Sequence, residues 1–146
     1  MSFSNTFETA LLNLIFNNSA LANLGDATGP IGSTAAGSLY ISLHSADVGE
    51  AGNQSTSELT YTGYARIPVL RSSAGWTVSG PTVTNTAQIQ FGICTAGAAS
   101  ATNFAIGYGA TGSGTVVLKG ALSSPLSIST GITPLFAAGA LSATID

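Results

Sequence analysis

The sequence predicts a mainly β protein, an antiparallel β-sandwich or jelly roll with one N-terminal α-helix. Only residues 5–24 repeat apolar side chains at helical spacing, whereas the chain from Ser38 onward alternates apolar and polar residues in short runs. Glycine, proline and serine separate those runs, and no second helical segment lies between them to build a parallel βαβ unit. Because 146 residues suit one domain, we expect a single domain over 1–146, with the sandwich at 38–146.

The N-terminal helix is expected over residues 5–24. Asn5-Thr6-Phe7-Glu8 has the pattern of a capping box, with Asn5 as the N-cap, and Gly25 can end the helix. A helix that is apolar around so much of its circumference requires contacts on more than one side. Two interpretations follow: the helix is buried in the protein's own core, or it is shared with a neighbouring subunit. The side chains concerned are Phe7, Leu11, Leu12, Ile15 and Phe16.

The rest of the chain is expected to alternate loops and short strands. Residues 26–37 predict a loop because they are rich in glycine, proline and small side chains, and the Gly/Ala/Ser segments 96–102 and 109–114 predict long turns. Pro68 cannot donate to a β-ladder, which places its strand at an edge or a bulge. Strands are expected at 39–44, 64–69, 76–79, 82–85, 88–93, 103–108, 115–121, 126–129 and 135–145.

The apolar members of these strands define the expected core. Trp76 is the largest of them, and we expect its ring to be buried. The full set is Leu39, Ile41, Leu43, Ile67, Val69, Trp76, Val78, Ile89, Phe91, Ile93, Ile106, Val117 and Leu126.

The composition excludes several classes of protein. Charged residues make up 6% of the chain and the net charge is −3, so nucleic-acid binding through phosphate contacts is not expected. The one cysteine, Cys94, excludes an internal disulfide, and the apolar run 11–16 is too short to cross a membrane. The first residues lack the basic segment of a secretory signal, so we expect synthesis in a cytoplasm. A surface with so little charge favours contact with other subunits.

Only one segment gathers titratable side chains, and it runs from Ser42 to Glu50. His44, Asp47 and Glu50 could form a histidine–carboxylate pair or a metal site, but their spacing matches no zinc pattern. Asp47 and Gly49 are residues that a turn requires by itself. We expect a structural turn, with a calcium site as the minor alternative, and therefore no metal, no cofactor and no catalytic residue.

Three other features have a structural and a functional interpretation. Cys94 is expected to be a small core residue rather than a nucleophile. The glycine-rich segment 107–114 resembles a phosphate loop in glycine content, but it lacks the Gly-Lys-Ser/Thr ending and a following helix. Tyr61 and Tyr64, near Arg66, could form a sugar-binding platform, although a tyrosine corner that closes one end of a sandwich is the favoured interpretation.

A set of motifs extends through most of the chain. The motifs are 39–58 (Leu-Tyr-Ile-Ser-Leu-His-Ser-Ala-Asp-Val-Gly-Glu at its start), 61–66, Arg71, 75–78, 94–97 and 131–140. Together they resemble a family of small tailed-bacteriophage virion proteins. The resemblance most specifically suggests capsid cement (decoration) proteins with a jelly-roll-like β-domain that bind outside an HK97-type shell, although relatives are often labelled tail-fibre proteins. It brings no catalytic residues.

These observations together predict a non-enzymatic structural protein on the exterior of a phage capsid. Its expected partners are the major capsid protein and further copies of itself, with no nucleic acid and no membrane. The helix side chains Phe7, Leu11, Leu12, Ile15 and Phe16 are the candidate contact with a neighbouring subunit or the capsid. The alternatives are a tail or fibre adaptor of the virion and, less favoured, a carbohydrate-binding module on the virion surface.

Overall fold

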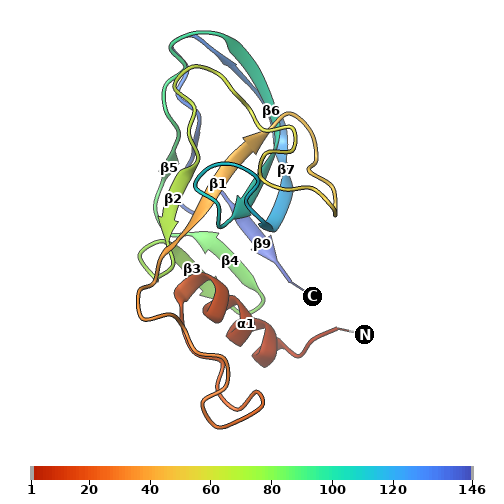
Figure 1. Cartoon of the computed structure of the whole chain (residues 1–146), viewed down its shortest axis with the longest axis vertical. Coiled ribbons are helices and arrows are strands. Elements are labelled where there is room, and N and C mark those ends of the chain that lie inside the picture. The colour runs from red at the N-terminus through yellow and green to blue at the C-terminus, as the bar shows by residue number, and fades with distance from the viewer. Residues whose placement is uncertain (1, 146) are drawn as a thin grey trace. The chain divides into compact units, whose positions relative to one another are not determined.

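The computed structural model describes residues 2–145 and divides them into two compact units. The helical unit comprises residues 2–38, 70–88 and 136–145, and the β unit comprises residues 39–69 and 89–135. Strands dominate the described residues, the ladders are antiparallel, and there is one helix (Figure 1). This confirms the mainly β class and is consistent with a β-sandwich; the expected single domain and jelly-roll connection stay predictions.

Helix α1 (Asn5–Asn17) is shorter than expected at its C-terminal end. Asn18 follows it in a left-handed conformation, with φ 55° and ψ 26°, and the amide of Ser19 closes the end on the Asn13 carbonyl at 3.1 Å. Asparagine tolerates this conformation, so the helix stops well before Gly25. The Asn18 side chain donates to the Ser33 carbonyl and accepts from the Ser33 amide, each at 2.8 Å. These two bonds join the ends of the loop 19–32.

The predicted capping box is also wrong by one residue. The N-cap is Ser4, whose hydroxyl accepts from the Phe7 amide at 3.4 Å, while the Glu8 amide donates to the Ser4 carbonyl at 3.0 Å. Asn5 therefore lies inside the helix, and Glu8 is one position too far along to complete a capping box. Among the described residues, no helix combines the length and the apolar content needed to cross a membrane.

The sheet of the helical unit contains β3 (Trp76–Ser79), β4 (Thr82–Asn85) and β9 (Ser142–Thr144), in the order β3-β4-β9. Helix α1 lies against β3 and β4 (Figure 1). The Phe16 ring meets the Trp76 ring edge-on at a centroid distance of 4.8 Å, and both side chains are fully buried. At the end of β4, the Asn85 side chain donates to the carbonyls of Ala87 and Ala137 and accepts from the Leu141 amide.

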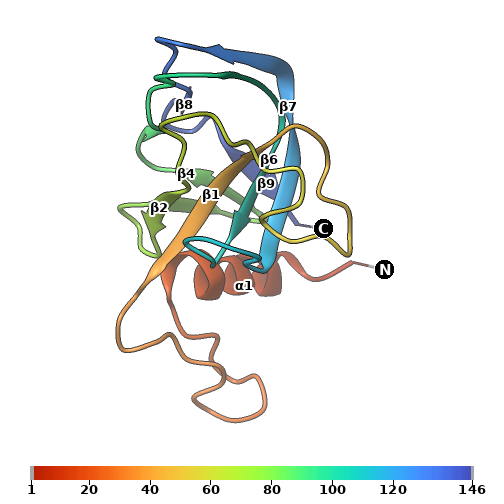
Figure 2. The same ribbon diagram turned by 45° about the horizontal axis from the view of Figure 1, so that its top comes forward.

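The β unit is built on a four-stranded sheet in the order β2-β1-β6-β7 (Figure 2). Its strands are β1 (Ser38–His44), β2 (Ile67–Leu70), β6 (Ala98–Gly107) and β7 (Val116–Ser129). Strand β2, which carries Pro68, is an edge strand, as expected. The short strands β5 (Ile89–Gln90) and β8 (Leu135–Phe136) pair with each other where the chain passes between the units.

Strand β7 forms the other edge of this sheet and is irregular. Ala101 pairs with Leu126 and Asn103 with Ala121, so the single residue Thr102 of β6 faces four residues of β7, including Pro125. A second register shift lies between Ile106 and Gly107 of β6. The two strands predicted at 115–121 and 126–129 are therefore one strand interrupted by a wide bulge.

Other strand predictions were also wrong in extent. Residues 98–102, expected as a turn, extend β6, because small side chains do not prevent pairing with residues 126–129 of β7. The strands expected at 64–69 and 88–93 shorten to β2 and β5. The strand expected at 135–145 divides into β8 and β9 around a turn in which Gly139 has a φ of 73°.

Most of the expected core is confirmed. The side chains of Leu39, Ile41, Leu43, Val69, Trp76, Ile89, Phe91 and Ile106 are buried. Ile93 is 49% exposed, because the buried neighbours Phe91 and Cys94 occupy the inward positions of that segment. Four further members of the predicted set are only half-buried, since they belong to short or edge strands: Ile67, Val78, Val117 and Leu126.

Candidate functional site

The five helix side chains proposed as a contact do not share one environment. Leu12 and Phe16 are buried, at 1% and 0% exposure, whereas Phe7, Leu11 and Ile15 are half-buried. Phe7 also packs against Phe3, with ring centroids 5.0 Å apart, and Phe3 is 55% exposed. The structure therefore places two of the five side chains in the interior, and a contact with a neighbour stays a prediction for Phe7, Leu11 and Ile15.

Asp47 and Glu50 lie in the turn after β1, and both bind Lys119 of β7. The Lys119 ammonium is 3.0 Å from both Asp47 carboxylate oxygens and 3.0 Å from Glu50 Oε1. Hydrogen bonding to Lys119 lowers the pKa of Asp47, and the same pairing raises the pKa of Lys119. Asp47 also accepts from the Gly49 amide at 3.1 Å, as a turn residue does. No group of three His, Cys, Asp or Glu side chains among the described residues is placed to hold a metal ion.

Removal of divalent cations is expected to leave the melting temperature unchanged. Lys119 already supplies the positive charge for Asp47 and Glu50, so a cation would have to displace it. The check is a thermal melt after dialysis against a chelator, compared with a melt in added calcium. A calcium-dependent rise of several degrees would show that the folded state binds the ion and would restore the minor calcium interpretation.

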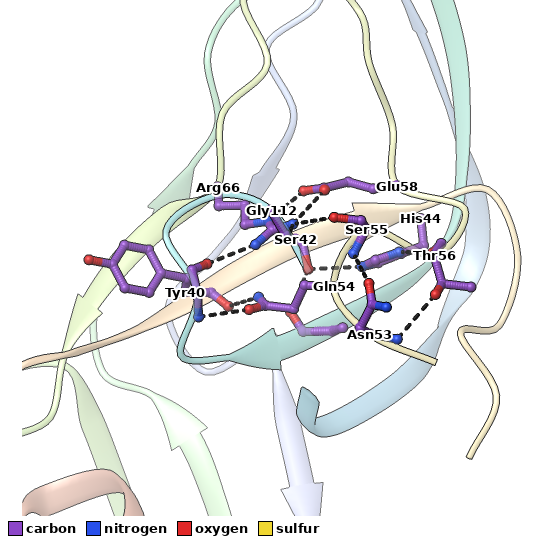
Figure 3. A network of polar contacts seen from close by, with 12 residues as sticks. Tyr40, Ser42, His44, Asn53, Gln54, Ser55, Thr56, Glu58, Arg66 and Gly112 are labelled. Atoms are coloured by element: carbon purple, nitrogen blue, oxygen red, sulfur yellow. Dashed lines mark hydrogen bonds and ion pairs between the residues drawn. The ribbon is translucent and has the colours of Figure 1, made fainter. Parts of the chain in front are cut away.

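His44 is separated from these carboxylates and points into the β unit. Its side chain is fully buried, with Nδ1 2.8 Å from the Thr56 carbonyl and Nε2 2.8 Å from the Ser42 hydroxyl (Figure 3). Because a carbonyl can only accept, Nδ1 carries the proton and Nε2 accepts from Ser42. Burial lowers the pKa of His44. The predicted trio of His44, Asp47 and Glu50 is thus not brought together.

The centre of the same region is a buried ion pair between Glu58 and Arg66. Arg66 Nε and Nη2 donate to the two Glu58 oxygens at 2.7 Å each, and Nη1 and Nη2 also donate to the carbonyls of Gly109 and Gly112 (Figure 3). The side chain of Arg66 is 3% exposed and that of Glu58 is 15% exposed. The Tyr64 hydroxyl donates to Glu58 Oε1 at 2.9 Å and accepts from the Leu43 amide at 3.0 Å. Such a bidentate pair fixes the relative orientation of the guanidinium and the carboxylate and also neutralises their charges.

Gln54 joins this ion pair to the glycine-rich segment 107–114. The fully buried Gln54 side chain donates to the Tyr40 carbonyl at 3.0 Å and accepts from the Gly109 amide at 2.9 Å. The backbone amide of Gln54 donates to the Gly114 carbonyl at 2.9 Å. A Cβ at Gly107 or Gly114 would overlap the Gln54 side chain. Close packing against Gln54 thus explains Gly107 and Gly114, and Gly109 lies close to Gly114 and Arg66. Gly112 has open space around it and a positive φ of 69°, which favours glycine.

Gly114→Ala is expected to destabilise the protein by about 1–3 kcal/mol, the usual cost of overpacking. The added Cβ would lie 2.6 Å from Gly109 Cα and would also meet the hydrogen-bonded Gln54 amide. Denaturant unfolding of the variant measures the loss, and Ser113→Ala, at an exposed neighbouring position, is the matched control. Equal stability of the two variants would mean that this segment moves aside at no cost.

The tyrosines proposed as a sugar platform contact each other and the core. Tyr61 and Tyr64 meet edge-on at 5.4 Å, and Tyr64 stacks on Phe91 at 6.1 Å. Tyr61 is 6% exposed, and its hydroxyl donates to the Gly92 carbonyl at 2.9 Å. A hollow of about 390 Å³ adjoins them, lined also by Thr60, Arg66 and Thr111. These ring contacts and the Tyr61 hydrogen bond fit the structural corner that the sequence favours, but both rings also line the hollow, so the choice between a corner and a sugar platform stays a prediction.

Cys94 is fully buried, as expected of a core residue, with Sγ directed at the carbonyls of Ala96 and Gly97. Sequence reasoning missed the joint role of Gln54, Glu58 and Arg66. Two charged residues in an otherwise uncharged stretch of chain were the available signal, because a chain with so few charges retains them where they have partners. Gln54 gave no such signal.

Comparison with known proteins identifies a family. A family model described as podophage GP4 fiber I protein gp80 matches residues 2–144. No curated protein matches the chain. The match supports the coarser part of the resemblance found in the motifs, a structural component of a phage virion, and does not single out a capsid cement protein. Because it covers nearly every residue, the chain belongs to the podophage GP4 fiber I protein family.

Proposed function

We propose that the protein is a structural subunit of the fibre apparatus of a podophage virion. The observation that carries this proposal is the family match over residues 2–144, whose description is a fiber protein. The function is then mechanical: the chain supplies folded units whose surfaces contact neighbouring virion proteins.

The use of charge within the chain supports a structural role. Arg66 pairs with Glu58, and Lys119 pairs with Asp47 and Glu50. Arg71 donates to the carbonyls of Leu14 and Ile15 near the end of α1 and to that of Ala36 in the loop before β1. The basic side chains are thus committed to holding the fold. Contacts with neighbours then depend on apolar and hydroxyl groups, which salt hardly weakens, and this is the reason to propose no nucleic-acid partner.

The same geometry supports a protein that is not an enzyme. Both ring nitrogens of His44 are bonded within the chain and the imidazole is fully buried. A general base must reach the proton that it removes from a substrate. A buried imidazole with both ring nitrogens hydrogen-bonded within the chain cannot do so. Cys94 is likewise enclosed.

A capsid cement protein is the second candidate, favoured by the motif resemblance in 39–58 and 131–140. In that case the partner is the major capsid protein and the location is the capsid exterior. Both candidates include contacts between copies of this chain.

Separating heads from tails of purified virions distinguishes the two candidates. We expect quantitative mass spectrometry to find the protein in the tail fraction, in a copy number that matches tail symmetry. Virions that lack it should package DNA normally and fail in adsorption. A copy number that matches the capsid subunits, in the head fraction, would overturn the fibre proposal and establish the cement protein.

The helix contact has its own test. Deleting residues 1–24 would remove Phe16 from Trp76 and so disturb the core, whereas Phe7→Ser with Leu11→Ser changes only half-buried positions. We expect the double variant to fold and to sediment as a smaller species than the wild type. Thr6→Ala, at an exposed position of the same helix, is the control, and an unchanged assembly of the double variant would exclude the contact.

A further inference from the structure

We propose that His44 is a pH-sensitive latch: while the imidazole is neutral it holds residues 45–58 and, through Gln54, residues 108–114 of the glycine-rich segment, and protonation of the buried ring favours the opening of both. The proposal is independent of whether the protein lies in the fibre or on the head. It is based on the position of His44 at the end of β1, where the chain leaves the sheet for the longest connection of the β unit (Figure 3).

The imidazole bonds the sheet on one side and the connection on the other. Nδ1 donates to the Thr56 carbonyl, and Nε2 accepts from Ser42 on β1, each at 2.8 Å. Nearby, the Ser45 amide donates to the Ser57 carbonyl at 2.9 Å, and the Leu59 amide to the Leu43 carbonyl at 3.0 Å. Thr56 is therefore held to the sheet through a side chain whose charge depends on pH.

Release of Thr56 would affect the glycine-rich segment, because Gln54 lies two residues away. Gln54 is bonded to Gly109 through its side chain and to Gly114 through its backbone. Arg66 adds bonds to the carbonyls of Gly109 and Gly112. The two segments are consequently joined through Gln54 and are held to β1 by His44 and by the bond from Gln54 to the Tyr40 carbonyl.

Protonation can be accommodated only at a cost. A proton on Nε2 turns this atom into a donor, so the Ser42 hydroxyl must turn away; the Ala105 carbonyl, 3.3 Å from it, is an available acceptor. Nδ1 keeps its hydrogen bond to the Thr56 carbonyl, and Glu58 favours the charged ring, but its carboxylate is already shared by Arg66 and Tyr64. Burial of the charge is the larger effect, and only opening of the segment relieves it by letting water reach the ring. Arg66 itself repels a charged imidazole.

The ionisable groups that face His44 are Glu58, Arg66 and, through Glu58, Tyr64; β6 contributes the neutral Asn103 opposite it. Asp47 and Glu50, in the following turn, neutralise Lys119. Burial, the main cause, lowers the pKa of His44 from 6.5. A lowered pKa in the closed state means that closure is most stable above pH 6.5 and weakens as the pH falls toward the lower value.

Hydrogen–deuterium exchange of the full chain at pH 7.5, 6.5, 5.5 and 5.0, corrected for intrinsic rates, tests the latch. Opening takes up one proton, so we expect protection in 45–58 and 108–114 to fall about tenfold for each pH unit below the ordinary histidine pKa. Residues 76–85 of the helical unit should not change. Constant protection of both segments down to pH 5.0 would overturn the proposal.

Two variants assign the effect to the imidazole. His44→Asn retains a donor near Thr56 but cannot take up the proton, so its protection should not depend on pH. Asp47→Asn with Glu50→Gln removes the carboxylates at Lys119 and should leave the dependence of the wild type intact. A loss of protection that persists in His44→Asn, or disappears in the double variant, would assign it to the carboxylates.

A measurement on the wild type covers the case in which His44→Asn does not fold. His44 is the one histidine of the chain, so its ring resonances in a histidine-labelled sample are unambiguous by NMR. We expect a single titration below the ordinary value, accompanied by shifts of amides in 53–58. A titration at or above the ordinary value would show that the buried imidazole takes up its proton without cost, and it would overturn the latch.

Discussion

Replacing Arg66 with alanine is expected to lower the free energy of unfolding by about 3–5 kcal/mol, the usual result of removing one partner from a buried ion pair. The substitution leaves the Glu58 carboxylate in a position where it is 15% exposed, without the two donors at 2.7 Å that now neutralise it. It also removes the donors to the carbonyls of Gly109 and Gly112. Denaturant unfolding followed by circular dichroism measures the loss.

Two controls separate charge from geometry in this experiment. Arg66→Lys retains the charge but cannot form the two-pronged contact, so we expect a loss between that of alanine and zero. Arg66→Met with Glu58→Gln removes both charges, and it should be less harmful than Arg66→Ala because no buried charge is left alone. If Arg66→Ala unfolds at the same denaturant concentration as the wild type, solvent enters the site and the ion pair does not hold it.

Replacing Trp76 with alanine is expected to cost about 3–5 kcal/mol, the range for truncating a buried aromatic side chain. Trp76 is fully buried and meets Phe16 of α1 edge-on, so its removal leaves a cavity under the helix. Ser79→Ala, at an exposed position of the same strand, is the matched control and should change the stability little. A loss below about 1 kcal/mol in Trp76→Ala would mean that the helix closes over the cavity.

The fold class could be predicted because the alternation of apolar and polar residues is a strong local signal for strands in this chain. Leu39, Ile41 and Leu43 alternate with more polar residues, and all three are buried on β1. The end of α1 could not be predicted, because it depends on partners distant in sequence. The Asn18 side chain, which follows the helix, is bonded to the backbone of Ser33, and Arg71 caps the Ile15 carbonyl at 2.6 Å from 56 residues away.

The strand limits failed for a related reason. Residues 98–102 contain side chains typical of turns, but residues 126–129 provide a partner strand for them. Propensity is a property of the segment, whereas pairing is a property of two segments, and here pairing decides.

Little of the candidate site could be predicted. The titratable residues of the segment 42–50 were evident, but the structure separates His44 from Asp47 and Glu50, because His44 ends β1 with its side chain buried whereas the two carboxylates lie in the following turn and bind Lys119. Lys119, which binds those carboxylates, lies 72 residues from Asp47. The role of Gln54 depends on backbone groups of Tyr40, Gly109 and Gly114. These partners are distant in sequence, so no local pattern indicates them.

The interruption of β7 has a consequence for how this protein survives at high concentration. An open strand edge invites the same edge of another molecule, and sheets that grow in this way become insoluble aggregates. Charged side chains normally discourage such growth, but β7 carries only Lys119, which is bound by Asp47 and Glu50 of its own chain. Pro125 and the four-residue bulge leave no long, regular row of free amides along this edge. Backbone geometry thus limits sheet growth along this edge, where most proteins depend on charged side chains.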